Sequence, residues 1–311
     1  MTTAIAASFG ERTSRPAWTM RRRGESAIAW LFVAPFLVGL VLFLLIPCLA
    51  VLAMAFTDWQ LGAGHISFTG LANFAEIASE RNVRISAGNT IAYALMVAPV
   101  SVVLGVWLAV SIESSAIGRT FFRSVFFLPV VSTTVAMAIV WEFLLHPSLG
   151  PINTAIAWLG FPRQSFLNNA STVLPTLAAI GTWENAGYIM VLVMAGLKTI
   201  PRELYDAAAV DGADRPYERF WTVTFPMLGP TLAFVIVVAF LRSFRVFETV
   251  AAITQGGPRR ASEVMLFTIY QEGFEFFRVG YASALTVVFV LVLLAITFAK
   301  FRLLDRRVHY T

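Results

Sequence analysis

"ELYDAAAVDGADRPYERFWTVTFP", residues 203–226, is a polar stretch in a 311-residue chain that is 58% hydrophobic and only 13% charged. The segments on either side, 173–197 and 231–250, are apolar and long enough to be membrane-spanning helices. A mean hydropathy of +0.75 and further apolar runs of this length exclude a single soluble domain. We therefore predict an integral membrane protein in which 203–226 connects two spans.

Six apolar runs are long enough to cross a hydrocarbon layer of about 30 Å. Because backbone polar groups cannot remain unpaired in lipid, these runs are predicted to be helices, which makes the chain an all-α membrane protein. The predicted spans are 27–56, 90–112, 125–145, 173–197, 231–250 and 280–300. Together they form a domain over 27–301, between an N-terminal tail, 1–26, and a C-terminal tail, 302–311.

The arginines and lysines predict the orientation. If the N-terminus is cytoplasmic, fifteen of the 23 basic residues fall in cytoplasmic segments and six in the outer loops. The positive-inside rule therefore places both termini in the cytoplasm. The pI of about 9.7 follows from this topology, so we expect lipid around the chain and no nucleic-acid partner.

The first span, 27–56, is predicted to be a retained helix. It is too long for the apolar region of a signal peptide. Cys48, the single cysteine, lies in this span. No disulfide can form within the chain, and no redox role is indicated.

Residues 203–226 predict two short helices. Small and apolar side chains recur at helical spacing on one face of the first: Leu204, Ala207, Ala208 and Asp211. Gly212 is expected to end this helix in a left-handed conformation. Pro216 is expected to begin the second helix after a polar cap at Asp214 or Arg215.

The loop is predicted to dock against another protein, and the alternative is a solvated connection. A solvated loop would gain nothing from the alanines, and Phe220 and Trp221 would expose an apolar patch to water. Both features favour docking.

The spacing of the loop resembles the EAA loop of bacterial ABC-importer permeases. Asp206-Ala207-Ala208 is followed after three residues by Gly212, and later by Val223-Thr224-Phe225-Pro226. Asp206 stands where that family usually has Glu, and ten residues separate Gly212 from Val223 where nine are usual, which leaves the register of the second helix open. The resemblance assigns the loop to 201–230 and implies that its first helix couples the chain to an ATPase. The coupling residues would be Glu203, Asp206, Ala207, Ala208, Asp211 and Gly212.

Further motifs extend the resemblance to the six-helix carbohydrate permeases related to the maltose and glycerol-phosphate uptake systems. They occur in order along the chain: Gly70-Leu71-Ala72-Asn73-Phe74, Trp183, Gly187-Tyr188, Thr254-Gln255-Gly256-Gly257-Pro258 and Gly280-Tyr281-Ala282-Ser283-Ala284. The resemblance implies a subunit of the bacterial inner membrane that works by alternating access. Its implied partners are a second, homologous permease, a dimer of cytoplasmic ATP-binding subunits and an extracytoplasmic solute-binding protein.

The chain is expected to hold no cofactor and to perform no chemistry of its own. It has no G-x-x-x-x-G-K-[ST] motif, so ATP and Mg²⁺ would be bound by the partner ATPase. His65, His146 and His309 are scattered, without an H-E-x-x-H pattern or a cysteine partner, which argues against a metal site. No G-x-S-x-G is present, so we predict no catalytic residues.

Charged residues within the predicted spans point to a solute path. A charge at the bilayer centre costs about 2.5–3.5 kcal/mol on insertion scales, so these groups should face the interior of the helix bundle. Nearby aromatic rings could contact the apolar face of a sugar. The predicted path residues are Glu184, Tyr188, Arg242, Phe244, Arg245, Phe247 and Glu248.

Three alternatives remain open at this point. Arg245 and Glu248, three residues apart, could simply pair on one helix face, and the phenylalanines could serve only in packing. The two arginines could bind an anionic glycerol phosphate or glycerophosphodiester, although a neutral sugar is slightly favoured. From a different class, the chain could be an ion-coupled secondary transporter or a channel working alone, with Glu184 as the coupling carboxylate.

Overall fold

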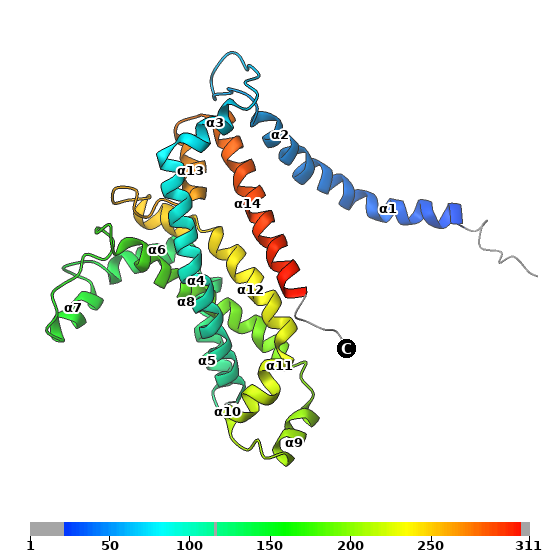
Figure 1. Cartoon of the computed structure of the whole chain (residues 1–311), viewed down its shortest axis with the longest axis vertical. Coiled ribbons are helices and arrows are strands. Elements are labelled where there is room, and N and C mark those ends of the chain that lie inside the picture. Colours follow the sequence, from blue (N-terminus) through cyan, green and yellow to red (C-terminus); the bar gives the residue numbers. More distant parts are fainter. Residues whose placement is uncertain (1–21, 115–116, 306–311) are drawn as a thin grey trace, which may run out of the picture. The chain divides into compact units, whose positions relative to one another are not determined.

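The computed structural model of the chain describes residues 22–114 and 117–305 (Figure 1). These ranges are helical, and their β-structure is one isolated antiparallel bridge between Thr57 and Phe68. The predicted all-α class is confirmed. The predicted tails lie largely outside the described residues.

The first of two compact units ends at Val51 and is described here by itself. It consists of α1 (Arg22–Leu40), the π-turn η1 (Val41–Leu45) and most of α2 (Ile46–Met54). The π-turn lies just before Pro47, whose missing N–H removes the bond that an α-helix would make to the carbonyl of Phe43. The apolar run 27–56 is therefore helical as far as Met54, with a local widening.

The second unit, 52–311, holds the remaining elements. They are α3 (Ala72–Ser79), α4 (Arg81–Ser114), α5 (Arg119–Val131), α6 (Thr134–Leu144), α7 (Pro151–Trp158), α8 (Val173–Leu197), α9 (Arg202–Val210), α10 (Pro216–Arg219), η2 (Phe220–Thr224), α11 (Phe225–Met227), α12 (Gly229–Phe244), η3 (Val250–Thr254), α13 (Met265–Tyr270), η4 (Gln271–Glu275) and α14 (Val279–Asp305).

Four described helices are long and apolar enough to cross a membrane, and six spans result if each of two bent helix pairs counts as one. The four are Trp30–Met54, Arg81–Ser114, Val173–Leu197 and Val279–Ala299. The bent pairs are α5 with α6, at 101°, and the segment Pro216–Met227 with α12, at 74°.

The prediction of one continuous helix over 125–145 is wrong. Ser132 and Thr133 adopt extended backbone angles between α5 and α6, and Pro129 has already removed one backbone donor from the last turn of α5. Serine and threonine hardly lower the hydropathy of an apolar run. The length of the run therefore gives no sign of this break. The prediction for 231–250 is also wrong at its end, because α12 stops at Phe244.

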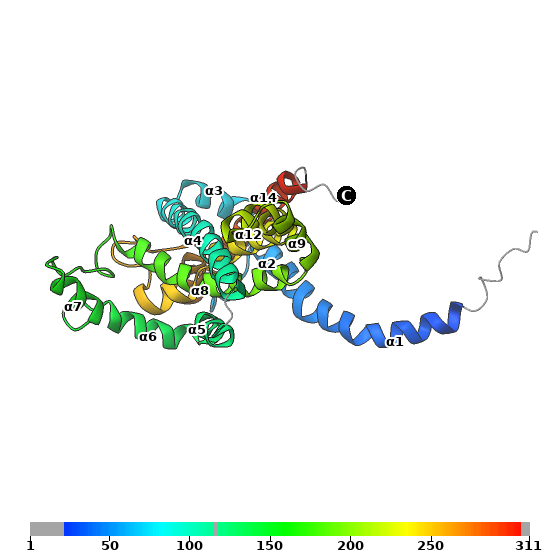
Figure 2. The ribbon, with the colours of Figure 1, turned by 90° about the horizontal axis from the view of Figure 1, so that it is seen from below.

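The core of this unit is the pair α4 and α8, with α12 packed beside both (Figure 2). Small residues let the backbones approach closely. A Cβ atom on Gly105 of α4 would lie 2.5 Å from Ile189 Cγ2 of α8, and a Cβ atom on Gly187 of α8 would overlap the carbonyl oxygen of Phe126 in α5. This close packing fixes the position of α8, which carries Glu184.

Candidate functional site

An open cavity of about 530 Å³ lies where the broken helices meet α8. Its wall comes from α4, α6, α8, the end of α12 with the segment after it, and the α13–η4 region. The lining residues are Tyr93, Thr134, Gly181, Glu184, Asn185, Arg242, Arg245, Val246, Phe247, Glu248, Thr249, Leu266, Ile269, Tyr270 and Phe274. Five of the seven predicted path residues are among them.

The breaks in the helices bring polar groups to the wall of the cavity. α5 has 13 residues and α12 has 16, so they rise only about 20 and 24 Å and neither crosses about 30 Å of hydrocarbon alone. Non-helical backbone at membrane depth must be buried in protein or line a water-filled space. Thr134 just after the first break and Arg245 at the end of α12 both line the cavity, so both breaks lie beside an open space.

Arg242 is held by three neighbours on α8. Its Nη2 lies 3.4 Å from Glu184 Oε1, and its Nε donates to Asn185 Oδ1 at 2.8 Å. The guanidinium carbon also lies 4.4 Å from the centre of the Tyr188 ring. Asn185 is fixed in turn, because its amide donates to the carbonyl of Gly181 at 2.9 Å. The two charges that have no partner on their own helices thus pair across the bundle.

Glu248 has a different partner from the one that sequence spacing suggested. Thr134 Oγ1, at the first residue of α6, donates to Glu248 Oε2 at 2.6 Å. Within the described ranges no ion pair joins Glu248 to Arg245. The reason is that α12 ends at Phe244. Arg245 lies just beyond the helix, in a turn, so Arg245 and Glu248 do not share a helix face.

Aromatic rings form one side of the cavity. The Phe247 ring lies 5.4 Å from that of Tyr270, and Tyr270 stacks on Phe274 at 5.5 Å. Phe244 does not belong to this wall, since its side chain is only 8% exposed and is buried inside the chain. Tyr188 contacts Arg242 rather than the cavity itself.

Sequence reasoning missed several lining residues, chiefly Asn185, Tyr270 and Phe274. Tyr270 and Phe274 are four residues apart, which is the spacing of neighbours on a helix face, so a pattern search beyond the predicted spans could have found them. Asn185 carried no signal of its own. Its role depends on the approach of α12 to α8.

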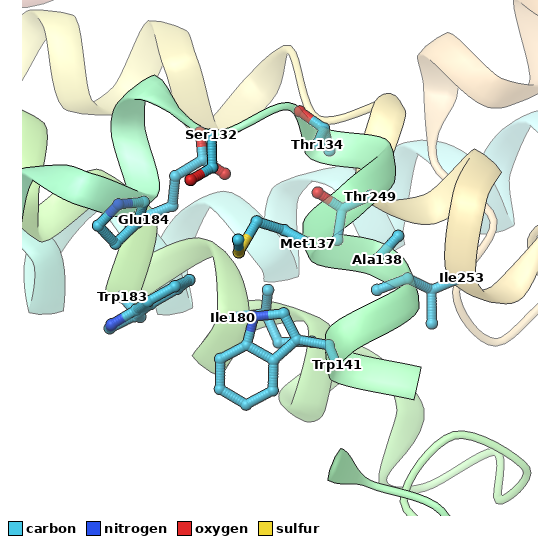
Figure 3. Close-up of a pocket in the computed structure, with 11 residues that line it drawn as sticks. Ser132, Thr134, Met137, Ala138, Trp141, Ile180, Trp183, Glu184, Thr249 and Ile253 are labelled. Carbon is cyan, nitrogen blue, oxygen red and sulfur yellow. The ribbon is translucent and has the colours of Figure 1, made fainter. Parts of the chain in front are cut away.

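A second, smaller cavity of about 10 Å³ lies behind Glu184 and has room for about one water molecule (Figure 3). Trp141 and Trp183 border it and pack edge to face with ring centroids 5.4 Å apart. Glu184, Thr134 and Thr249 line both cavities. The carboxylate of Glu184 is therefore reached from two sides.

The predicted coupling loop has the expected left-handed glycine. Gly212 has φ +92°, and a Cβ there would meet no atom within 4 Å. The amide of Ala213 donates to the carbonyl of Ala208, and that of Gly212 to the carbonyl of Ala209, which is the Schellman arrangement that ends α9. The turn thus requires a left-handed residue but leaves space around it.

The two faces of α9 differ from the prediction. Tyr205 and Ala208 pack against the core of the chain, and the Tyr205 hydroxyl lies 3.1 Å from Thr224 Oγ1. Glu203 and Ala207 are exposed, and Val210 is 88% exposed. Ala207 and Ala208 therefore do not share the outer face, because adjacent residues of a helix diverge by about 100°.

The second helix of the loop begins after Arg215, whose amide donates to the carboxylate of Glu218 at 3.0 Å. Its α-helical start gives way to the π-turn η2, Phe220–Thr224. A π-turn holds one residue more than an α-helical turn, so it can absorb the tenth residue between Gly212 and Val223.

No cluster of three or more His, Cys, Asp or Glu side chains that could hold a metal ion occurs within 22–114 and 117–305. Cys48 is exposed and unpaired.

Residues 101–310 match the family described as "Binding-protein-dependent transport system inner membrane component". The chain is 30% identical over 284 residues to the sn-glycerol-3-phosphate transport system permease protein UgpA of Agrobacterium fabrum, covering 91% of this chain and 96% of that one. It is 28% identical to the arabinooligosaccharides transport system permease protein AraP of Bacillus subtilis, covering 90% and 89%.

Among solved structures, the chain resembles a subunit in the crystal structure of a bacterial ABC transporter involved in the import of the acidic polysaccharide alginate. The TM-score is 0.81, and the match covers 92% of this chain and 98% of that one at 22% sequence identity. The broken helices around the cavity thus belong to a fold that recurs in a solved transporter.

Proposed function

Because the chain belongs to the family of binding-protein-dependent transport system inner membrane components, we propose that its cavity forms one half of a solute path shared with a second, homologous permease. The chain is a multi-pass inner-membrane permease subunit of an ABC importer. Family membership favours this reading over an ion-coupled transporter working alone. We place both termini in the cytoplasm, as the distribution of basic residues predicts.

The solute is a sugar or a sugar-like molecule. The lining of the 530 Å³ cavity supports this solute class. It includes the aromatic rings of Phe247, Tyr270 and Phe274 and the hydrogen-bonding groups of Glu184 and Arg245. An aromatic wall suits the apolar face of a sugar ring, and polar groups suit its hydroxyls. The names of two relatives refer to solutes of this kind, glycerol phosphate and arabino-oligosaccharides.

Energy reaches this subunit through α9. A dimer of cytoplasmic ATPase subunits binds ATP and Mg²⁺, and the exposed face of α9, with Glu203, Ala207 and Val210, docks on it. Tyr205 and Ala208 on the opposite face contact the core, and the Tyr205–Thr224 hydrogen bond joins α9 to η2. A movement of the ATPase can thus bias the permease between two states that differ in their contacts.

An extracytoplasmic binding protein delivers the solute to the outer loops. In support, one similar structure is titled as a complex with an alginate pentasaccharide-bound periplasmic protein. The test is purification of the tagged chain from native membranes, followed by uptake assays in vesicles. We expect copurified ATPase and second permease, and sugar uptake that survives ionophores but stops on ATP depletion. Uptake by the purified chain alone, driven by an ion gradient, would contradict the proposal.

A further inference from the structure

The two arginines of the cavity differ in what they can still bind. Arg242 is already engaged by Glu184 at 3.4 Å, by Asn185 at 2.8 Å and by the ring of Tyr188. Its charge is matched and its Nε donor is used. A solute anion at Arg242 would have to displace the carboxylate of its own subunit.

Arg245, by contrast, has an exposed side chain that lines the same cavity. Across 22–114 and 117–305, its guanidinium forms no ion pair, hydrogen bond or ring contact with this chain. Its place at the end of α12 is favourable for a cation, because the C-terminal end of a helix is partly negative. All five of its N–H donors are available.

Glu248, three residues after Arg245 in the chain, forms a hydrogen bond with Thr134 and does not pair with Arg245. Its Oε2 accepts the hydrogen bond from Thr134, at the N-terminal end of α6, where the helix field favours an anion. The other acidic group of the cavity, Glu184, is paired with Arg242. Glu248 keeps its charge, because a threonine hydroxyl is neutral, but within the described ranges it forms no ion pair with Arg245. The guanidinium of Arg245 is therefore available to an anion in a cavity that the rings of Phe247 and Tyr270 also line.

We propose that Arg245 is a specificity residue that binds an anionic substituent of the transported sugar, a carboxylate or a phosphate, while the sugar ring lies against Phe247 and Tyr270. This rests on the proposed function and narrows its solute class from sugars and sugar-like molecules in general to those that carry an acidic group. A guanidinium donates two parallel hydrogen bonds to either anion, so Arg245 recognises the shared chemistry of both. The cavity, at about 530 Å³, has the size of a site for a mono- or disaccharide.

The test uses the complete importer, with its cognate permease, ATPase and binding protein, reconstituted in liposomes that contain ATP. The probes are matched pairs: digalacturonate with galactobiose for the carboxylate, and glycerol 3-phosphate with glycerol for the phosphate. We expect wild-type uptake to favour the acidic member of one pair, which identifies the anion. Arg245→Gln should lower that preference by about 10- to 100-fold, the range expected for losing a hydrogen bond to a charged group.

Two matched variants and one assembly measurement complete the design. Arg245→Lys should keep more of the preference than Arg245→Gln, and Arg81→Gln, at an exposed arginine outside the cavity, should leave it unchanged. Because the binding protein is the same throughout, a change of preference belongs to the permease. Copurification of the second permease should be equal in all variants.

Other outcomes overturn the inference. If wild type imports only the neutral probes, or if Arg245→Gln lowers both members of a pair equally, Arg245 does not select an anion, although the proposed function stands. If Arg245→Gln releases the second permease, the guanidinium pairs with that subunit instead. If neither pair nor any other sugar is imported, the proposed function fails as well.

Discussion

Glu184 and Arg242 are 58 positions apart in the chain, and each meets its counter-ion only because α12 packs on α8. Their side chains are 32% and 37% exposed, so water screens part of the attraction. The pair still matters, since either charge alone would remain half-buried at membrane depth. The two residues of the ion pair are not equally supported. Arg242 also contacts Asn185 and Tyr188, and these contacts remain when Glu184 is replaced.

The additional contacts of Arg242 predict which of two single variants of the ion pair is less stable. Arg242→Gln leaves the carboxylate of Glu184 unpaired, whereas Glu184→Gln leaves Arg242 with Asn185 and Tyr188. We expect Arg242→Gln to destabilise the solubilised complex by about 1–3 kcal/mol and Glu184→Gln by less. Thermal unfolding of the purified complex measures both. The double variant should be less destabilised than the sum of the two single variants. Strict additivity would show that the two residues are not coupled.

At the scale of elements, the proposed function depends on α9 and the two broken helix pairs. α9 presents Glu203, Ala207 and Val210 outward and ties Tyr205 and Ala208 to the core. η2, between Gly212 and the start of α12, holds one residue more than an α-helical turn. α5 and α12 end beside the cavity and supply the non-helical backbone that lines it.

The outward face of α9 predicts the effect of a bulky residue there. Ala207→Trp should hold the ATPase surface away and abolish both copurification of the ATPase and ATP-driven uptake. Ala157→Trp, at an exposed alanine of α7, is the matched control and should leave both unchanged. Membrane levels of the two variants should be equal by immunoblot. Full ATPase binding by Ala207→Trp would mean that this face of α9 is only solvated.

The left-handed turn after α9 allows a second matched test. Gly212 and Gly62 have nearly equal φ angles of +92° and +90°, and a Cβ on either would meet no atom within 4 Å. A β-branched residue at either position is strained by about 1 kcal/mol or more. We expect Gly212→Val to impair ATP-driven uptake by displacing α9, whereas Gly62→Val should have little effect. Equal loss in both variants would point to general destabilisation instead of coupling.

At the scale of the whole molecule, the chain forms part of an assembly. Within the second unit, α4, α8 and α12 form the core around which the broken helices are arranged. The cavity of this subunit remains open, as expected for half of a shared path. The positive-inside rule predicts which end of this bundle faces the cytoplasm.

Thiol labelling tests that orientation. In a Cys48→Ser background, Arg259→Cys on the predicted outer loop should react with an impermeant maleimide on intact cells, and Ile117→Cys on the predicted cytoplasmic loop should not. Both positions are exposed, and Ile117 is 87% exposed. Neighbouring Gly256 is unsuitable because it is buried against Phe267. Labelling of Ile117→Cys alone would reverse the orientation argued from the arginines.

The sequence by itself determined the class, the apolar runs, the polar loop and the left-handed end at Gly212, because hydropathy, helical spacing and glycine conformation are local properties. The family resemblance likewise depended on short motifs, and it is confirmed. Only the tertiary structure decided that Arg242 pairs with Glu184 and Asn185, that Glu248 pairs with Thr134, and that Arg245 stays available. It also decided that the runs 125–145 and 231–250 are not continuous helices and that Ala208 faces inward. The physical reason is that contacts between residues of different helices depend on how those helices pack. The spacing of the residues along the chain does not determine the distance between them in the bundle.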